Sequence, residues 1–286
     1  MLLLLPPSEG KTPAPDDAAP ADLSTLSGAD ALTGLRQAVL TALASVSARS
    51  DACAVLGVGP SLAAEVARNT RLEVEPAAPA ARVYTGVLYA AAGLGDLVSG
   101  GGFDGLDHRE GAEQRVTDCV RIFSGLWGAV SPADRIPAYR LSMSVDLPGV
   151  GKLAAAWRGP LGAALDARAA GDVVVDCRSA PYVAAWKPRP DDADWVTVRV
   201  VREVRGTRAV VSHNAKHTRG VLAGHLLRRA ANPPSSSSGL LDAAGELVGT
   251  VVGTEVGTGL SYTLLDAALT PARTRTAPAT LELLIS

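Results

Sequence analysis

The chain has 286 residues, of which 47% are hydrophobic and 20% are charged, so it has enough apolar side chains for a sizeable core and is not a disordered chain. A formal net charge of −2 excludes a globally basic nucleic-acid coat protein, so any basic surface must be local. Three cysteines without a C-x-x-C spacing argue against a disulfide scaffold or a zinc ribbon and favour a reducing compartment. Because there is no stretch of about 20 apolar residues, we expect a cytoplasmic protein with no membrane partner.

The spacing of apolar residues and of turn-forming residues predicts an irregular series of helices and strands. In chain order, the first half is predicted to hold a buried strand over 2–5, a loop over 13–21, a helix over 29–46, a pair of short helices over 52–68, a strand over 83–90 and a glycine-rich turn over 100–105. The second half is predicted to hold a helix over 112–123, a helix over 152–169 interrupted near Gly159-Pro160, a strand over 172–176, a hairpin over 195–212, a basic helix over 214–230, a loop over 232–239 and β-like stretches over 245–265. Because the alternation is mixed rather than strictly strand–helix–strand, we expect an α+β fold with a single domain over 1–286.

The segment LLLLPPSEGKT, residues 2–12, contains the glycine-lysine-threonine sequence that ends a phosphate-binding P-loop. A P-loop also needs a glycine five residues before that glycine, where this chain has a leucine, and Pro6 and Pro7 remove two backbone N–H donors. We therefore exclude a P-loop. What remains is a strand that delivers Ser8, Glu9 and Lys11 to a turn at its end, where side chains often face a site; the alternative is a solvated surface turn.

Lysine is rare in this chain. Of 27 basic residues, 23 are arginine and four are lysine, namely Lys11, Lys152, Lys187 and Lys216. This ratio is typical of a coding bias that replaces surface lysines with arginines. A lysine that remains is a candidate for a site that needs a compact, titratable amine, although chance explains any single lysine equally well.

The stretch VLGVGPSLAAEV, residues 55–66, resembles the helix-hairpin-helix signature, in which a glycine-valine-glycine turn joins two short helices. Gly57 and Gly59 allow backbone conformations that other residues resist. Backbone amides at the start of the second helix can then bind a DNA phosphate without reading the bases. The alternative is an ordinary tight corner between two helices.

Residues 199–229 hold seven arginines and Lys216 against one acid, Glu203. In the predicted helix, Lys216 and Arg219 are three residues apart and face the same way near its N-terminus. Cations at this position oppose the helix dipole unless an anion lies nearby, so the pair indicates an anion site. His213 and His217 are four residues apart and could share a metal, but they lack an acidic or cysteine partner at helical spacing. We therefore expect no metal and no cofactor.

Short clusters of hydroxyl, basic and aromatic residues follow one another through the rest of the chain. They are Lys11-Thr12, VYTG at 83–86, SGLWG at 124–128, YRLSM at 139–143, Ser179 with Tyr182, Lys187, and A-K-x-x-R-G at 215–220. In this order and spacing they resemble the peroxide stress protein YaaA family, and the resemblance covers nearly the whole chain. The chain departs from the family at PPSEGKT, where members often read SPAKT, and at His213-Asn214, where an aromatic residue often precedes the A-K-x-x-R-G motif.

The resemblance implies one compact mixed α/β domain of unusual topology with a helix-hairpin-helix element at 52–68. It also implies a positively charged cleft that binds DNA, and a role in surviving hydrogen peroxide by protecting DNA from iron-driven oxidative damage. By position, the residues that the resemblance places on the cleft are Lys11, Tyr84, Ser124, Tyr139, Arg140, Ser179, Tyr182, Lys187, Lys216 and Arg219, in addition to Gly57 and Gly59 of the glycine turn.

Two alternatives stay open. A cluster of lysine, tyrosine and serine could instead belong to an enzyme acting on a nucleotide, a nucleobase or damaged DNA, in which case a nucleotide-like small molecule is the partner. The candidate catalytic residues are then Lys11, as an amine that forms a Schiff base with an abasic sugar, and Lys216 with Tyr182 for proton transfer. The second alternative is an iron-handling protein, which His213 and His217 alone would support. The sequence does not decide whether the chain is an enzyme.

Overall fold

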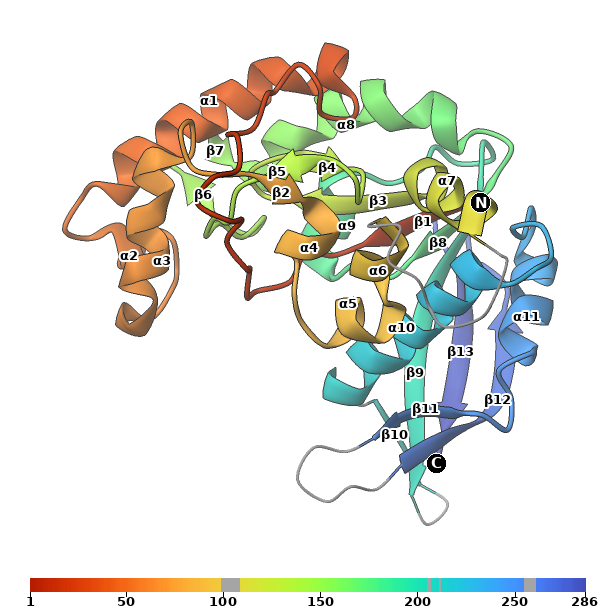
Figure 1. The fold of residues 1–286 in the computed structure, drawn as a ribbon. Coiled ribbons are helices and arrows are strands. Elements are labelled where there is room, and N and C mark those ends of the chain that lie inside the picture. Colours follow the sequence, from red (N-terminus) through yellow and green to blue (C-terminus); the bar gives the residue numbers. More distant parts are fainter. Residues whose placement is uncertain (99–108, 205–206, 211, 255–260) are drawn as a thin grey trace.

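A twisted β-sheet runs through the whole molecule, as the ribbon in Figure 1 shows. The structure is a computed structural model that describes residues 1–98, 109–204, 207–210, 212–254 and 261–286. The strands of the large sheet are β1 (Leu2–Leu5), β3 (Val120–Ser124), β4 (Gly128–Val130), β8 (Val173–Asp176), β9 (Asp194–Val204), β10 (Thr207–Val210), β11 (Val251–Thr254), β12 (Ser261–Thr270) and β13 (Ala279–Ile285). Two small sheets are formed by β2 (Ala78–Pro79) with β5 (Arg135–Ile136), and by β6 (Asp146–Leu147) with β7 (Gly151–Lys152).

The large sheet is parallel at its centre and antiparallel at its edges. Its strand order is β11-β12-β13-β9-β8-β1-β3-β4, with β10 paired to β9. The strands β13, β9, β8, β1 and β3 are all parallel to one another. The outer pairings, β3 with β4, β13 with β12, β12 with β11 and β9 with β10, are antiparallel. The described residues therefore form a compact mixed α/β unit, and its parallel centre is a feature that the irregular order of the predicted elements does not reveal.

Helices cover both faces of the sheet. Those of eight residues or more are α1 (Ala29–Ser47), α7 (Arg109–Cys119), α8 (Leu153–Ala169), α10 (Ser212–Arg228) and α11 (Ser237–Gly245). The shorter ones are α2 (Ala52–Val55), α3 (Ala63–Arg68), α4 (Ala80–Val83), α5 (Val87–Ala92), α6 (Leu94–Val98), α9 (Ala180–Ala185) and the 3-10 turns η1 (Pro60–Leu62) and η2 (Asn69–Arg71). In Figure 1, α1 and α8 lie above β1 and β3, whereas α5 and α10 lie below them. Among the described residues, no helix is both long enough and apolar enough to cross a membrane.

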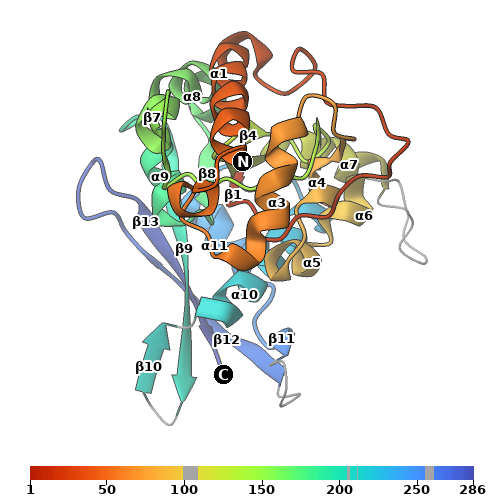
Figure 2. The same ribbon diagram turned by 90° about the vertical axis from the view of Figure 1, so that its left-hand side faces the viewer.

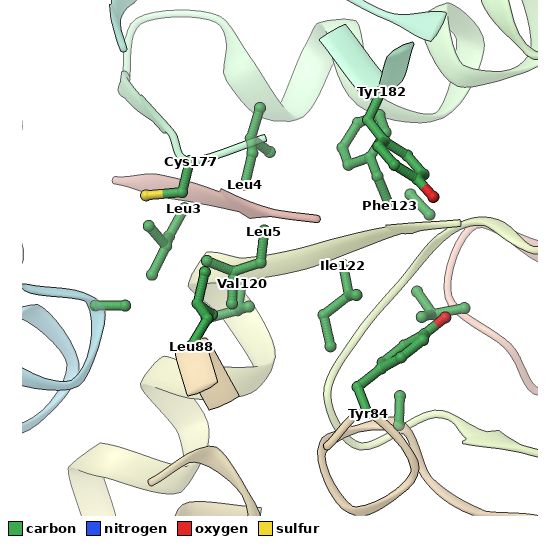
Figure 3. Packing of buried hydrophobic residues seen from close by; sticks show 14 of the residues in the cluster. Leu3, Leu4, Leu5, Tyr84, Leu88, Val120, Ile122, Phe123, Cys177 and Tyr182 are labelled. Carbon is green, nitrogen blue, oxygen red and sulfur yellow. The ribbon is translucent and has the colours of Figure 1, made fainter. Parts of the chain in front are cut away.

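The central strand is β1, whose four leucines are completely buried. Leu3 pairs with Val120 of β3 on one side and with Val175 of β8 on the other. A strand that is covered on both faces needs an uninterrupted apolar run, which explains why this segment reads LLLL rather than alternating. The predicted strand over 2–5 is confirmed, and Figure 3 shows its leucines packed among neighbouring core side chains.

The order of the strands marks the carboxyl end of β1 as the expected position of a site. The chain leaves β1 and returns as β3 on one side, then crosses through α8 and returns as β8 on the other side. Connections that diverge from neighbouring parallel strands leave an opening outside their carboxyl ends, and ligands of open α/β sheets bind there. We therefore expect a binding site among the residues that follow β1, β3 and β8.

Several other predicted elements are confirmed. They are the helix over 29–46 as α1, the pair of short helices over 52–68 as α2 and α3, the strand over 172–176 as β8, the hairpin over 195–212 as β9 and β10, and the basic helix over 214–230 as α10. The β-like stretches over 245–265 contain β11 and the start of β12, and the loop over 232–239 ends where α11 begins. The predicted glycine-rich turn over 100–105 lies outside the described residues.

Three predictions were wrong. Residues 83–90 form the end of α4 and most of α5 rather than a strand, because Gly86, with φ of 143°, turns the chain between two short alanine-rich helices. The helix over 112–123 ends at Cys119, since the next five residues pair with β1 as β3. The helix α8 is not interrupted at Pro160, because Trp157 and Leu161 are both buried and anchor the helix on either side of the proline.

Candidate functional site

Lys11 lies just beyond the end of β1 and is paired with Tyr84 in an isolated β-bridge. Its side chain folds back over the turn that precedes it. The amine Nζ donates hydrogen bonds to the carbonyl oxygens of Ser8 (3.0 Å) and Glu9 (3.3 Å), and it lies 4.5 Å from the centre of the Tyr139 ring. The residue is partly exposed, so the site can be reached from solvent.

The surroundings of Lys11 change its protonation. Burial and the positive charge of Arg140 lower the pKa of Lys11 to about 7, while the carboxylates of Glu65 and Glu9 act in the opposite direction. An amine with this pKa is present in both forms at neutral pH. The neutral form has a free lone pair, which a nucleophile or a general base needs.

Three buried hydroxyl groups lie next to Lys11. Ser124, the last residue of β3, accepts hydrogen bonds at Oγ from the backbone N–H groups of Leu126 (3.1 Å) and Trp127 (2.9 Å). The same Oγ lies 2.6 Å from the Tyr139 hydroxyl, which lies 2.9 Å from the Tyr84 hydroxyl. Burial raises the pKa of both tyrosines well above its usual value, so both hydroxyl groups keep their protons at neutral pH.

Arg140 follows Tyr139 and closes the site on the side of α3. Its guanidinium donates to the Glu9 carbonyl oxygen (2.8 Å) and forms an ion pair with Glu65 of α3 (3.4 Å). Its backbone is held by the buried side chain of Asn69, which accepts from the Arg140 N–H and donates to the Arg140 carbonyl, both at 2.9 Å. The pair of short helices therefore contributes a carboxylate to the Lys11 site.

Tyr182 approaches the site from α9, which follows β8. Burial raises its pKa, and so does Glu9, whereas hydrogen bonds with the Met143 backbone and with Ser142 act in the opposite direction. Figure 3 shows Tyr182 and Tyr84 on opposite sides of the β3 ribbon, near its carboxyl end. Side chains that follow three adjacent parallel strands are thus gathered at one edge of the sheet.

A buried ion pair positions α9. Arg178 and Asp176 are both inaccessible to solvent at their side chains and are joined by two side-chain hydrogen bonds of 2.9 and 2.7 Å. The Arg178 guanidinium lies 4.1 Å from the centre of the Phe123 ring and donates to the Tyr182 carbonyl oxygen (3.2 Å). Arg178 therefore ties the end of β8 to β3 and to the helix that carries Tyr182.

The glycines of two sequence motifs permit close packing around the site. A Cβ atom on Gly125 of SGLWG would lie 3.0 Å from the backbone carbon of Ser142 in YRLSM, so a larger residue at this position would push the backbones of the two motifs slightly apart. A Cβ atom on Gly220 of A-K-x-x-R-G would lie 2.3 Å from the Leu88 carbonyl oxygen. Because glycine has no side chain, α10 can pack directly on α5 at this position.

Direct contacts connect four of the predicted residues, Lys11, Tyr84, Ser124 and Tyr139. Arg140 joins them through the Glu9 carbonyl oxygen, to which Lys11 also donates. Tyr182 is joined to them through its electrostatic influence on Tyr84 and Tyr139. The remaining predicted residues lie elsewhere on the surrounding elements: Ser179 is exposed at the start of α9, Lys187 is exposed after α9, Lys216 is exposed on α10, and Gly57 and Gly59 are exposed in the turn after α2.

Arg219 has a structural partner. Its guanidinium donates two hydrogen bonds, of 3.0 and 2.7 Å, to the Val198 carbonyl oxygen of β9. Lys216, one turn earlier on α10, is exposed. The two cations of the predicted anion site therefore have different surroundings. Figure 2, which looks at this side of the molecule, shows α10 in the foreground below α3 and α5.

Sequence reasoning missed Asn69 and Glu65 as parts of the site. Glu65 lies inside the stretch that resembles a helix-hairpin-helix. This motif predicts phosphate contacts from glycines and backbone amides, and it predicts no role for a carboxylate. Asn69 follows directly after α3, and its only sequence signal is a polar residue close to an apolar helix. Its complete burial explains its role, since a buried amide needs hydrogen-bond partners and finds them on Arg140.

Two histidines have protein partners in the described part of the chain. His217 Nδ1 lies 2.7 Å from the Val252 carbonyl oxygen, and His225 Nε2 lies 2.8 Å from a Glu246 carboxylate oxygen. The side chain of His213 lies outside the described residues. Within the described part of the chain, no group of three or more histidine, cysteine, aspartate and glutamate residues is arranged to hold a metal ion.

Lys11, with its lowered pKa, and a chain of buried hydroxyl groups lie at the carboxyl ends of parallel strands, which is where ligands of open α/β sheets bind. The comparisons with known proteins give the family. A family model described as "Peroxide stress protein YaaA" matches residues 1–243, and the chain belongs to this family.

Related proteins carry no description of an activity in their names. A UPF0246 protein of Streptomyces coelicolor is 43% identical over 250 residues, which are 86% of this chain and 90% of that protein. A UPF0246 protein of Corynebacterium efficiens is 37% identical over 226 residues, covering 78% of this chain and 83% of that protein. One from Corynebacterium glutamicum is 34% identical with the same coverage of both chains.

Proposed function

We propose that the chain is a DNA-binding protein of the peroxide stress response and that DNA binds around the opening at Lys11 and Arg140. One observation carries this proposal: the Glu9 carbonyl oxygen accepts hydrogen bonds from both Lys11 and Arg140, cations that are far apart in the sequence. Two cations held side by side by one backbone group are pre-organised for an anion such as a phosphate. Membership of the peroxide stress family supports the biological setting, in which bound DNA is protected from iron-driven oxidation.

In this proposal, exposed groups on other elements also contact the DNA. Lys187 and Lys216 are exposed and add positive charge without an effect on the core. The turn at Gly57 and Gly59 is also exposed, so its backbone amides are accessible to a phosphate in the manner of a helix-hairpin-helix. Glu65 opposes binding, because a phosphate at Arg140 has to displace its carboxylate.

A salt titration with charge-reversal variants tests the proposal. Binding to a labelled duplex and to a nicked duplex is measured between about 50 and 300 mM salt, where a few phosphate contacts give a clear slope. We expect the double variant Lys187→Glu and Lys216→Glu to bind at least about tenfold more weakly and to reduce the slope by about two. Both positions are exposed, so the fold should be retained.

The matched control is the double variant Arg273→Glu and Arg275→Glu, which changes the net charge by the same amount in the exposed connection between β12 and β13. If DNA binds around Lys11, this control keeps the affinity and the slope of the parent protein. Equal losses in both double variants would mean that binding follows net charge alone, and no measurable binding by the parent would overturn the proposal.

A second candidate function is favoured by the lowered pKa of Lys11, which burial and Arg140 bring to about 7. A free amine at neutral pH can attack the aldehyde carbon of an abasic sugar, so the chain would then be an enzyme acting on damaged DNA. Borohydride reduction of a mixture with an abasic oligonucleotide should leave a covalent adduct on Lys11 of the parent protein. The variant Lys11→Arg should give none, and the absence of an adduct in the parent would remove this candidate.

A further inference from the structure

The three hydroxyl groups next to Lys11 carry one more proton than the hydrogen bonds between them require. Ser124, Tyr139 and Tyr84 carry one hydroxyl proton each, and two oxygen–oxygen contacts, of 2.6 and 2.9 Å, join them. Each contact takes one proton. One of the three protons therefore has no acceptor with a free lone pair within this group of buried hydroxyls.

The backbone decides where that proton lies. Both lone pairs of Ser124 Oγ are occupied by the N–H groups of Leu126 and Trp127, so Ser124 must donate its own proton to Tyr139. The unmatched proton is consequently on one of the two tyrosines. A buried hydroxyl donor without an acceptor costs about 1–3 kcal/mol, so its persistence in a fold indicates an acceptor that is present in the working protein.

A second unmatched donor lies beside the first. The indole N–H of Trp127 is buried and has no hydrogen-bond partner among the described residues. The Trp127 ring meets the Tyr139 ring edge-on, with centroids 6.1 Å apart. Two neighbouring buried donors without acceptors favour a ligand that brings a hydrogen-bond-accepting oxygen.

The same place offers a nucleophile. Lys11 Nζ lies 4.5 Å from the centre of the Tyr139 ring, and its two hydrogen bonds go to the carbonyl oxygens of Ser8 and Glu9. In the neutral amine these two bonds use both N–H groups, so the nitrogen lone pair stays free. A free amine and an unmatched O–H donor are the two groups that addition to a carbonyl requires.

We propose that this site takes an aldehyde or ketone, whose oxygen accepts the unmatched tyrosine proton while its carbon is attacked by Lys11. The inference rests on the second candidate function and names the chemical class of its substrate. The amine lone pair forms the C–N bond, the π electrons of the carbonyl move to oxygen, and that oxygen takes the hydroxyl proton. The proton released from nitrogen restores the hydroxyl group, and loss of water then gives the imine.

Pyridoxal tests the proposal as a simple aldehyde probe. The folded protein is treated at pH 7 with pyridoxal and cyanoborohydride, and the modified lysines are quantified by peptide mass spectrometry. We expect Lys11 to be labelled at least about tenfold faster than the exposed Lys187 and Lys216. The double variant Tyr84→Phe and Tyr139→Phe removes both tyrosine hydroxyls that could carry the unmatched proton, and it should slow labelling of Lys11 by about 10- to 100-fold, since a positioned proton donor contributes at least this much.

A second reagent separates chemistry from a change in structure. Trinitrobenzenesulfonate modifies amines without placing a proton on a carbonyl oxygen, so the double variant Tyr84→Phe and Tyr139→Phe should change its rate at Lys11 by less than about twofold if the amine itself is intact. Equal slowing with both reagents would show that the two tyrosine hydroxyls only support the fold of the site. Labelling of Lys11 no faster than of Lys187 would overturn the proposal.

The DNA titration keeps the two proposals apart. The double variant Tyr84→Phe and Tyr139→Phe leaves every cation in place, so it should bind DNA like the parent protein even where it reacts slowly with pyridoxal. The Lys187→Glu and Lys216→Glu double variant can lose DNA binding while pyridoxal still labels its Lys11 at the normal rate. That result would leave the carbonyl site intact. Normal DNA binding without selective labelling of Lys11 would remove the carbonyl site alone.

Discussion

The turn after β1 and the helix α10 both carry basic residues, but they place them in opposite environments. At the turn, Lys11 is surrounded by backbone carbonyl groups and aromatic rings, and burial lowers its pKa to about 7. On α10, Lys216 is exposed and Arg219 is bound to the backbone of β9. The density of positive charge along the sequence is far greater near α10. The comparison teaches that burial, rather than the number of charges nearby in the sequence, lowers the pKa of an amine.

The largest expected difference between the two regions is in amine chemistry. Lys11→Gln should abolish labelling of the site by pyridoxal, because no other amine lies at the carboxyl end of β1 in the described contacts. Lys216→Gln should leave labelling at Lys11 unchanged. Quantitative peptide mass spectrometry measures both, and an unchanged total yield at the turn after Lys11→Gln would contradict the comparison.

A smaller but clear difference is expected in stability. Arg178→Ala leaves Asp176 as a buried charge without its partner and should lower the free energy of unfolding by about 3–5 kcal/mol. Arg199→Ala breaks a largely exposed pair with Glu282 in the region of α10 and should lower it by less than about 1 kcal/mol. Denaturant titration of both variants checks this. Similar losses would show that the two regions do not differ in the burial of their ion pairs.

The dependence of labelling on pH should report the lowered pKa of Lys11. Since only the neutral amine reacts, labelling of Lys11 should rise with pH through about 7 and level off near pH 8. The sign for stability follows from the same shift. The folded state disfavours protonated Lys11, so this penalty is complete below pH 7 and disappears as the pH rises toward the unfolded value of about 10.4. A flat pH profile at Lys11 would contradict the lowered pKa.

The smallest expected effect concerns Glu65. Glu65→Gln removes a carboxylate that competes for Arg140 and that raises the pKa of Lys11, so DNA should bind about two- to threefold more tightly and Lys11 should react at slightly lower pH. Glu73→Gln is a control that changes the same charge on the neighbouring segment, where Glu73 is paired with Gln37. Weaker DNA binding after Glu65→Gln would show that Glu65 organises Arg140 rather than competing for it.

Local patterns in the sequence were sufficient for several elements. Four consecutive leucines identify the central strand, since only a strand covered on both faces tolerates such a run, and the apolar spacing of residues 29–46 identifies α1. The scarcity of lysine in the sequence is sufficient to name Lys11 as a candidate site residue. Tyr84, Ser124, Tyr139 and Arg140 were named from short motifs, and the structure brings them together with Lys11.

Other features depend on contacts between distant segments and could not be read from local patterns. The stretch 83–90 has the composition of a strand but forms parts of two helices, because Tyr84 pairs with Lys11 and Gly86 reverses the chain. The role of Arg219 is set by a carbonyl group of β9 that is 21 residues away in the sequence. Likewise, the charge of Glu65 becomes relevant to Lys11 only because α3 packs beside Arg140.

The position of β1 at the very start of the described chain also governs how the molecule is made. Leu2 finds its partner on β8 only when Val174 has been synthesised, and its neighbour Leu3 pairs with Val120 of β3. At about 5–20 residues per second, an emerging chain holds four unpaired leucines for roughly 10–30 seconds before the centre of the sheet can close. The leucines that later form the core therefore stay apolar and unpaired during most of the synthesis of the sheet, because their two partner strands come much later in the chain.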